Sequence, residues 1–280
     1  MTFNTLIGAD ALRSLIAGAT PPLVLDASFD LGDTAAGERS FAQAHIPGSL
    51  YVHLDRDLCA PKTGRNGRHP LPSRGDVART AGALGVTPQT QVITLDRQGG
   101  MYAARLWWML RWLGHAQVAV LDGGLAAWQA AGGQTSTDVA KPVPAAPYPD
   151  LPSLAGSVDA ASLASGLGQR AVIDARSPER FRGDKEPIDA VAGHIPGALN
   201  RFHAGNLADG RFKPAEQLRS EFVELLGGRA PGDVVHSCGS GVTACHNLLA
   251  MEHAGLRGSL LYPGSWSEWS SDPGRPIARG

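Results

Sequence analysis

The chain repeats itself once, and this internal repeat constrains its fold more than any other feature. Residues 23–27 (LVLDA) return at 171–175 (AVIDA), and residues 45–50 (HIPGSL) return at 194–199 (HIPGAL). The copies lie roughly 140 to 150 residues apart, which is the size of a domain and much longer than a solenoid repeat. The 280-residue chain is therefore expected to fold as two related domains.

A third repeated segment differs between the two halves in its last residue. Residues 92–96 (VITLD) return at 234–238 (VVHSC), so Asp96 stands where the second copy has Cys238. Between the copies, a stretch rich in proline and alanine is typical of a linker. We expect a first domain over residues 1–138, a linker over 139–156 and a second domain over 157–280.

Short apolar runs alternate with helical patterns in each half. Residues 171–173 and 234–236 are continuous and β-branched, as in strands of a parallel sheet buried on both faces. Residues 215–226 and 243–254 have helical patterns, and the apolar run 106–110 (LWWML) is flanked by arginines, which suits a buried helix. The alternation predicts an α/β fold in which each domain has a mainly parallel sheet flanked by helices.

Composition and cysteine count argue against several classes of protein. The net charge is −1, and the basic cluster around Arg65 and Arg68 is short and glycine-rich, which we interpret as a solvated loop without a nucleic-acid partner. No apolar run reaches the ~20 residues that span a bilayer, and no secretory signal pattern is present, so we expect a cytoplasmic protein without membrane partners. Cys59, Cys238 and Cys245 form no Cys-x-x-Cys pair, so neither a disulfide framework nor a metal or other cofactor is expected.

The segment around Cys238 carries the chemistry. A predicted strand ends at this cysteine, the glycine-rich residues 239–241 follow, and a helix is expected to begin near Thr243. Ligands of an open α/β sheet bind beyond the carboxyl ends of its strands. Glycines allow successive backbone N–H groups to converge on one point, and a helix N-terminus adds positive potential there. These features predict a stabilised Cys238 thiolate that acts as a nucleophile, whereas Cys245, inside the helix, is expected to be a packing residue.

Residues 238–243 (CGSGVT) resemble the active-site loop of 3-mercaptopyruvate sulfurtransferases, which belong to the rhodanese superfamily. The repeated His-Ile-Pro-Gly element, the turn at 122–124 and the segment at 264–266 also resemble tandem rhodanese domains. The resemblance implies a silent first domain, in agreement with Asp96, which cannot carry a sulfane sulfur. It implies transfer of sulfur from 3-mercaptopyruvate, through a persulfide on Cys238, to cyanide or a thiol such as a reduced thioredoxin-like protein.

The same resemblance implies a set of residues that bind the donor. Arg180 matches the family's anion-binding arginine, and a guanidinium suits a carboxylate because it offers a planar pair of donors. The family's second arginine is missing from residues 185–189 (KEPID), so Arg182 or Lys185 is expected to substitute for it. Arg176 is open to a structural role as a partner of Asp174 or Glu179. The remaining binding residues expected from the loop are Gly239, Gly241, Val242 and Thr243.

A Ser-His-Asp set is also implied by the resemblance. It comprises Ser240 of the cysteine loop together with His69 and Asp55, which come from the first predicted domain. Such a set would protonate the leaving enolate or activate an acceptor. His45 and His194 belong to the repeated turn and occur in both halves, so they are expected to be structural.

Three other functions are alternatives to sulfur transfer from 3-mercaptopyruvate. A thiosulfate sulfurtransferase would share the fold and the persulfide, but Gly239 and Ser240 replace the basic pair that would favour a dianionic donor. A rhodanese-like phosphatase would need an arginine six positions after the cysteine to hold phosphate, and Ala244 stands there. A sulfur-relay protein would carry persulfide between partner proteins without turning over a free donor.

Overall fold

The computed structural model describes residues 2–280, which form two compact units. Unit 1 contains residues 2–59 and 72–154, and unit 2 contains residues 60–71 and 155–280. The tandem arrangement predicted from the repeat is therefore confirmed. Unit 2 also includes a short segment, residues 60–71, that lies within the first half of the sequence.

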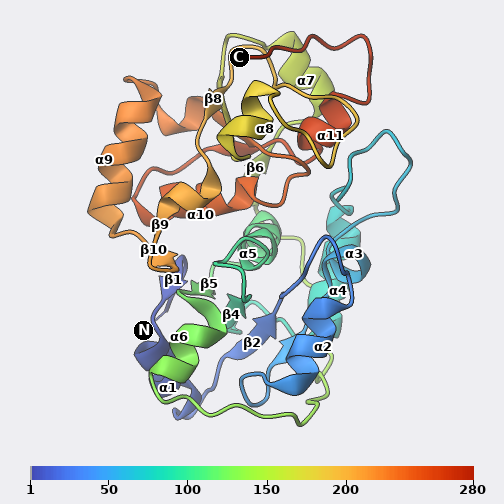
Figure 1. Ribbon diagram of the computed structural model, residues 1–280. Coiled ribbons are helices and arrows are strands. Elements are labelled where there is room, and N and C mark those ends of the chain that lie inside the picture. Colours follow the sequence, from blue (N-terminus) through green and yellow to red (C-terminus); the bar gives the residue numbers. More distant parts are fainter. Residues whose placement is uncertain (1) are drawn as a thin grey trace. The chain divides into compact units, whose positions relative to one another are not determined.

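Unit 1 is built on one parallel sheet flanked by helices. Within residues 2–280 its strand order is β1-β5-β4-β2-β3. Figure 1 shows α1 and α6 beside each other at one flank of this sheet and α2 and α4 at the other. The strands are β1 (Leu6–Ile7), β2 (Leu23–Asp26), β3 (Leu50–Tyr51), β4 (Val92–Leu95) and β5 (Val118–Leu121), and the helices are α1 (Ala9–Ile16), α2 (Ala36–Gln43), α3 (Leu54–Asp57), α4 (Arg74–Ala83), α5 (Ala103–Trp112) and α6 (Gly124–Ala130).

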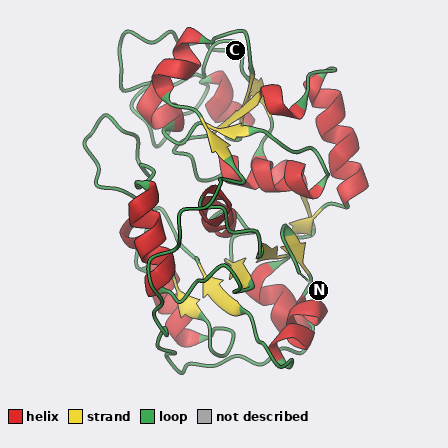
Figure 2. Ribbon diagram, turned by 180° about the vertical axis from the view of Figure 1, so that it is seen from behind, coloured by secondary structure: helices red, strands yellow, loops and turns green. Residues whose placement is uncertain are grey.

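Unit 2 repeats this architecture. Its parallel sheet has the order β6-β12-β11-β7-β8, which matches the first sheet strand for strand, and a small antiparallel pair is added. Figure 2 shows strands in yellow with helices in red around them in this unit. The strands are β6 (Gly156–Ser157), β7 (Ala171–Asp174), β8 (Leu199–Asn200), β9 (Leu207–Ala208), β10 (Arg211–Phe212), β11 (Val234–Ser237) and β12 (Leu260–Leu261), and the helices are α7 (Ala160–Ser165), α8 (Pro178–Arg182), α9 (Ala215–Leu226), α10 (Ala244–His253), α11 (Ser265–Trp269) and the 3₁₀ turns η1 (His203–Asn206) and η2 (Pro231–Asp233).

Most central strands of the two units are buried along their whole length. All four residues of β4, β5, β7 and β11 are buried, so these strands show no alternation of buried and exposed positions, and even their polar residues, such as His236 in β11, are buried. The predicted α/β fold with a parallel sheet in each domain is confirmed. The apolar run at 106–110 lies in α5, where Trp107 and Trp108 are each 1% exposed, so the predicted buried helix is also confirmed.

The repeated His-Ile-Pro-Gly turn has the same structural role in each unit. His45 stacks on Phe41 with ring centroids 4.0 Å apart, and His194 stacks on Phe181 at 3.8 Å. In both pairs the histidine Nδ1 lies 2.8 Å from the carbonyl oxygen of the stacked phenylalanine. These contacts anchor the turn to the preceding helix, which supports the structural interpretation of both histidines.

Among residues 2–280, no helix is both long enough and apolar enough to cross a membrane. This finding agrees with the absence of a long apolar run in the sequence.

Candidate active site

Cys238 lies directly after the buried strand β11, at the carboxyl edge of the second sheet. Its side chain is almost completely buried, at 1% exposure. Its Sγ atom accepts hydrogen bonds from two loop amides, Ser240 N at 3.4 Å and Gly241 N at 3.2 Å. Helix α10 begins shortly after the loop, at Ala244, so its N-terminus adds positive potential nearby. The loop therefore provides a cradle for a negatively charged sulfur.

The conformation of Gly241 is required for this cradle. Its φ is +75°, in the left-handed region that glycine adopts without strain. A Cβ at this position would lie 2.1 Å from the carbonyl oxygen of Pro263, which is far inside contact distance. Only glycine therefore fits here while its N–H points at the sulfur.

Ser265 also contacts Cys238, and no sequence pattern predicted a role for it. Its hydroxyl lies 4.0 Å from the Cys238 Sγ, accepts the Cys238 N–H at 3.0 Å and donates to the Tyr262 carbonyl at 2.9 Å. Ser265 is fully buried and has a φ of +53°, which is rare for a residue other than glycine. The sequence signal was its place in the segment 264–266, which resembles tandem rhodanese domains, but nothing in that resemblance indicated a contact with the cysteine.

Two members of the expected Ser-His-Asp set are in contact. The Ser240 Oγ lies 2.7 Å from the Nδ1 of His69, and both residues are buried. His69 belongs to the segment 60–71, which folds as part of unit 2. Asp55 lies in α3 of unit 1, where its N–H donates to the Nδ1 of His53 at 3.1 Å. Its inclusion in the set stays a prediction.

Arg180 lies beside the cysteine loop, on the short helix α8. A Cβ at Gly239 would lie 3.4 Å and 3.6 Å from the Nη2 and Nη1 atoms of Arg180. The guanidinium is held by Glu186, which accepts from its Nε at 3.0 Å, and by Asp189, which accepts from its Nη2 at 3.0 Å. The expected anion-binding arginine is thus placed next to the loop and held in position by two carboxylates.

The two carboxylates differ in how their surroundings affect their charge. Burial alone would raise the pKa of Glu186, but hydrogen bonds from Arg180 and from backbone N–H groups outweigh it and lower that pKa. Burial raises the pKa of Asp189, and the nearby charge of Glu186 adds to this, against the opposing effect of Arg68 and Arg180. Asp189 is therefore the carboxylate whose charge the site stabilises less.

Arg176 is a structural residue. Its guanidinium forms ion pairs with Asp174 at 2.6 Å and Glu186 at 3.3 Å, and it lies 4.9 Å above the ring of Trp266. Burial opposes its charge, but Asp174 and Glu186 together raise the pKa of Arg176. Of the two partners expected from the sequence, Asp174 is confirmed, whereas its second carboxylate is Glu186 rather than Glu179.

Arg68 was not predicted as a site residue, yet it lies against the same loop. A Cβ at Gly239 would be 2.9 Å from its Nη2 atom, and its Nη1 atom forms an ion pair with Asp189. Its side chain is only 22% exposed, so the expectation of a solvated loop is wrong for Arg68, although Arg65 is exposed as expected. The contact joins residues 121 positions apart, and no local sequence pattern could have indicated it.

Of the other expected binding residues, two belong to the cysteine loop and the start of α10, and two are exposed to solvent. Val242 is buried within the loop, and Thr243 is the N-cap residue of α10, although its side chain makes no capping hydrogen bond. Arg182 and Lys185 are exposed, and Arg182 pairs with Asp184 at 2.8 Å. The structure thus brings Arg68, rather than Arg182, against Gly239, and a binding role for Arg182 or Lys185 stays a prediction.

The equivalent loop of unit 1 is closed around a carboxylate. Asp96 follows β4 as Cys238 follows β11, and it is buried. It accepts four backbone N–H groups, with Oδ1 bonded to residues 98 and 100 and Oδ2 to residues 102 and 103, at 2.7 to 2.9 Å. The amides that would face a sulfur anion are therefore occupied by the protein's own side chain, and position 96 has no thiol that could carry a sulfur from a donor.

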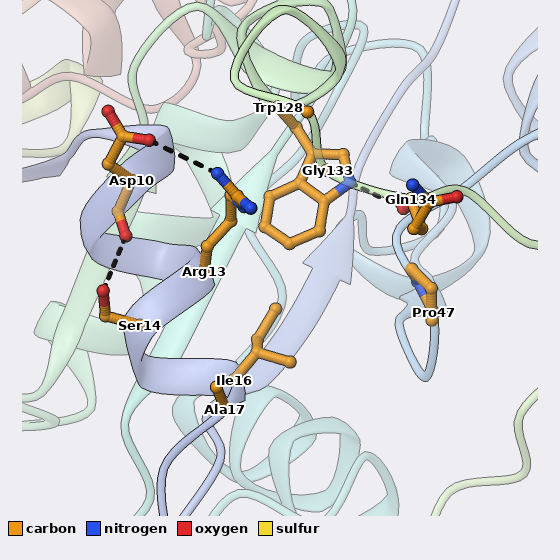
Figure 3. A pocket seen from close by; sticks show the side chains of 10 residues that line it. Asp10, Arg13, Ser14, Ile16, Ala17, Pro47, Trp128, Gly133 and Gln134 are labelled. Atoms are coloured by element: carbon orange, nitrogen blue, oxygen red, sulfur yellow. Dashed lines mark hydrogen bonds and ion pairs between the residues drawn. The ribbon is translucent and has the colours of Figure 1, made fainter.

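Unit 1 also has a surface pocket of about 620 Å³ between α1 and the residues that follow α6. Figure 3 shows Arg13 and Trp128 along this pocket, with the Trp128 ring nitrogen bonded to the Gln134 carbonyl at 2.7 Å. No cysteine lines it. Among residues 2–280, no group of three or more His, Cys, Asp or Glu side chains is arranged to hold a metal ion. The Cys238 loop therefore remains the candidate active site.

Comparison with known proteins identifies related chains. The family model for the rhodanese-like domain matches residues 9–131 and again residues 159–272. A probable 3-mercaptopyruvate sulfurtransferase of Pseudomonas aeruginosa is 48% identical over 263 residues, covering 92% of each chain. Thiosulfate sulfurtransferase of Gallus gallus is 33% identical over 252 residues, covering 88% of this chain and 85% of the relative.

Solved structures have the same architecture. The crystal structure of SseA from Escherichia coli, whose description refers to the rhodanese fold and to 3-mercaptopyruvate sulfotransferases, superposes with a TM-score of 0.79 at 29% identity. The match covers 94% of this chain and 99% of SseA. The similarity extends over both units, as the two family matches also do.

Proposed function

The chain belongs to the rhodanese-like domain family, and from this membership we propose that it is a sulfurtransferase whose sulfur donor is 3-mercaptopyruvate. Cys238 carries the sulfur as a persulfide and passes it to a thiol or to cyanide. The donor and the acceptor are then small molecules or protein thiols that reach the same cysteine in turn. The tandem fold and the names of the relatives support this proposal.

One observation carries the proposal. The Cys238 Sγ accepts two backbone N–H groups from its own loop, at 3.4 Å and 3.2 Å. Such donors stabilise an anion without needing to reorganise during the reaction, as they do in an oxyanion hole. Both resting forms of a sulfur-transfer cysteine, the thiolate and the persulfide, are anions. A single cradle therefore serves both halves of the cycle.

The first half-reaction breaks a carbon–sulfur bond. The Cys238 thiolate attacks the sulfur of the donor, a sulfur–sulfur bond forms, and the electron pair of the broken bond remains on carbon as the enolate of pyruvate. The proton of the donor thiol balances this step when it is delivered to the enolate carbon. The products are pyruvate and a persulfide anion on Cys238.

The contact between Ser240 and His69 suits the transfer of that proton. The two side chains are 2.7 Å apart and buried, and Ser240 belongs to the loop that surrounds the sulfur. A hydroxyl hydrogen-bonded to an imidazole can take a proton on one side and release it on the other. We assign this role to Ser240 and His69, with Asp55 as the third member expected from the family resemblance.

The second half-reaction returns the cysteine to its starting form. A thiolate or cyanide attacks the outer sulfur, the sulfur–sulfur bond breaks, and its electron pair returns to Cys238 as a thiolate. The acceptor leaves as a persulfide or as thiocyanate. We predict that the acceptor is a reduced thioredoxin-like protein and that the protein is located in the cytoplasm.

The test is steady-state sulfur transfer with 3-mercaptopyruvate and thiosulfate side by side. Wild type is compared with Cys238→Ser and with Cys59→Ser, a matched change at a half-buried thiol outside the loop. We expect a kcat/KM at least tenfold higher for 3-mercaptopyruvate, which is about 1.4 kcal/mol, and loss of transfer only in Cys238→Ser. Mass spectrometry of the wild type after donor treatment should find one added sulfur on Cys238.

Other outcomes point to the second candidate function or overturn the proposal. A preference for thiosulfate would keep the nucleophile and the fold but replace the donor, as in the Gallus gallus relative. Activity that survives in Cys238→Ser would contradict the assigned nucleophile. A wild type that turns over neither donor, but accepts persulfide from a protein partner, would make the chain a sulfur relay.

A further inference from the structure

Two guanidinium groups from distant parts of the sequence face the same residue of the cysteine loop. A Cβ at Gly239 would lie 2.9 Å from Nη2 of Arg68 and 3.4 Å from Nη2 of Arg180. Arg68 belongs to segment 60–71 and Arg180 to helix α8, and both are part of unit 2. Both guanidinium groups are thus directed at Gly239, the residue that follows Cys238.

Asp189 joins these two arginines. One of its oxygens accepts from Nη1 of Arg68, and the other accepts from Nη2 of Arg180 at 3.0 Å. Its side chain is 7% exposed, against 22% for Arg68 and 18% for Arg180. A buried carboxylate between two cations holds both in place and offsets their mutual repulsion.

The arginines lie at one end of a row of alternating charges. The row runs from Asp174 and Arg176 through Glu186 to Arg180, Asp189 and Arg68, with neighbours joined by ion pairs. It contains as many carboxylates as guanidinium groups. The surroundings of the loop are therefore balanced in charge before a donor binds.

Arg68 retains hydrogen-bonding capacity at the end of this row. Its Nε is buried and has no hydrogen-bond partner among residues 2–280. Its ion pair with Asp189 uses Nη1, which leaves Nη2 directed toward Gly239. A donor carboxylate beside Gly239 would supply the acceptor that this guanidinium lacks.

We propose that Arg68 and Arg180 together bind the carboxylate of the sulfur donor, and that Asp189, which bridges them, selects donors with a single negative charge. This inference rests on the proposed function and adds its donor selectivity. In the balanced row, a monocarboxylate adds one negative charge next to a thiolate. Thiosulfate adds two, and the fixed charge of Asp189 opposes the second.

The experiment measures kcat/KM for 3-mercaptopyruvate and thiosulfate in variants of these two residues. We expect Arg68→Gln to lower kcat/KM for 3-mercaptopyruvate by about tenfold to a hundredfold, mainly through KM, because a charge-assisted hydrogen bond is lost. Arg68→Lys should recover part of this loss, since it restores the charge but not the planar fork. Inhibition by pyruvate, which shares the carboxylate, should weaken in parallel.

Asp189→Asn tests the selectivity separately. Removing one buried negative charge beside the donor should lower the ratio of kcat/KM for 3-mercaptopyruvate over thiosulfate by about tenfold or more. Arg65→Gln is the matched control, because Arg65 is an exposed arginine of the same segment and should leave both donors unchanged. Circular dichroism establishes that each variant is folded, and Arg68→Lys remains available should Arg68→Gln fail this check.

The outcomes separate this inference from the function on which it rests. A wild type that is inactive with both donors would contradict the proposed function itself. An active wild type whose Arg68→Gln variant keeps kcat/KM and pyruvate inhibition within threefold would overturn the role of Arg68 alone. A donor ratio that does not change in Asp189→Asn would overturn the charge selection.

Discussion

Gly241 determines the geometry of the sulfur site more directly than any other single loop residue. Its N–H is the closer of the two donors to the Cys238 Sγ, at 3.2 Å. A side chain is excluded here by the left-handed backbone and by the carbonyl of Pro263, which a Cβ would approach to 2.1 Å. The loop and the segment before α11 can approach each other only because this position has no Cβ.

Gly241→Ala is therefore expected to reduce sulfur transfer by more than tenfold. The left-handed strain costs about 1 to 2 kcal/mol, and the contact with Pro263 forces the loop to move, which withdraws an N–H from the sulfur. Gly228→Ala is the control, since Gly228 has a φ of +90° but nothing within 4 Å of an added Cβ. The control should lose thermal stability and keep its activity. Equal activity in the two variants would contradict this explanation.

At this scale the local sequence pattern predicted the residues of the loop, the family resemblance added Arg180 and His69, and Arg68 and Ser265 were missed. Cys238, Ser240 and Gly241 are close together in sequence, so a strand followed by glycines and a helix was enough to indicate them. Arg68 and Ser265 contact the loop through the tertiary fold, at separations for which a single sequence has no signal. His69 was predicted through the family resemblance, and in the structure its Nδ1 lies 2.7 Å from the Oγ of Ser240.

The element that distinguishes the two halves is the loop between a central strand and the helix that follows it. In unit 2 the loop after β11 directs two N–H groups at a sulfur atom. In unit 1 the loop after β4 directs four N–H groups at the carboxylate of Asp96. The same position in the fold thus supports a reactive side chain in one half and a structural one in the other.

Asp96→Asn should therefore destabilise unit 1 without affecting the chemistry of unit 2. The amide can accept through only one atom, so about two of the four charge-assisted bonds are lost, at about 3 kcal/mol or more in total. Thermal unfolding followed by calorimetry measures the loss. Asp10→Asn, at an exposed carboxylate of the same unit, should unfold as the wild type does. Unchanged stability in Asp96→Asn would mean that these four bonds contribute little.

Long and buried elements were predictable, whereas very short ones were not. Helix α9 was predicted with its observed bounds, Ala215–Leu226, and the buried strands β7 and β11 each extend one residue beyond the predicted run. Strands of two residues, such as β6 and the β9–β10 pair, are too short to produce a period in the sequence. Their strand conformation is fixed by the neighbouring strand rather than by their own residues.

Across the whole molecule, each unit buries a histidine that the site does not use. His115 of unit 1 lies 3.0 Å from the hydroxyl of Tyr148, and His236 of unit 2 lies in the central strand β11, with its Nε2 3.2 Å from the sulfur of Met251. Burial lowers the pKa of His115 to about 4 and that of His236 to about 3. Both histidines are neutral in the folded protein near neutral pH.

Stability is accordingly expected to fall in mild acid. Below a pH of about 6.5 these histidines take up protons in the unfolded chain but not in the folded chain. The free energy of unfolding is therefore unaffected by them above that pH and decreases as the pH falls toward about 4 and 3. Each histidine contributes a slope of up to about 1.4 kcal/mol per pH unit. Unfolding midpoints measured between pH 7 and pH 5 should show a shallower slope in His236→Gln than in the wild type. Identical slopes would contradict the neutral buried state.

The membership of residues 60–71 in unit 2 has a consequence for how the halves of this molecule can be inherited. A gene duplication followed by recombination at the linker would transfer residues 155–280 as a module, with the cysteine, its loop and Arg180. The transferred module would lack Arg68 and His69, which are encoded in the other half. The first half of the sequence therefore cannot be lost without also removing the contacts that Arg68 and His69 make with the cysteine loop.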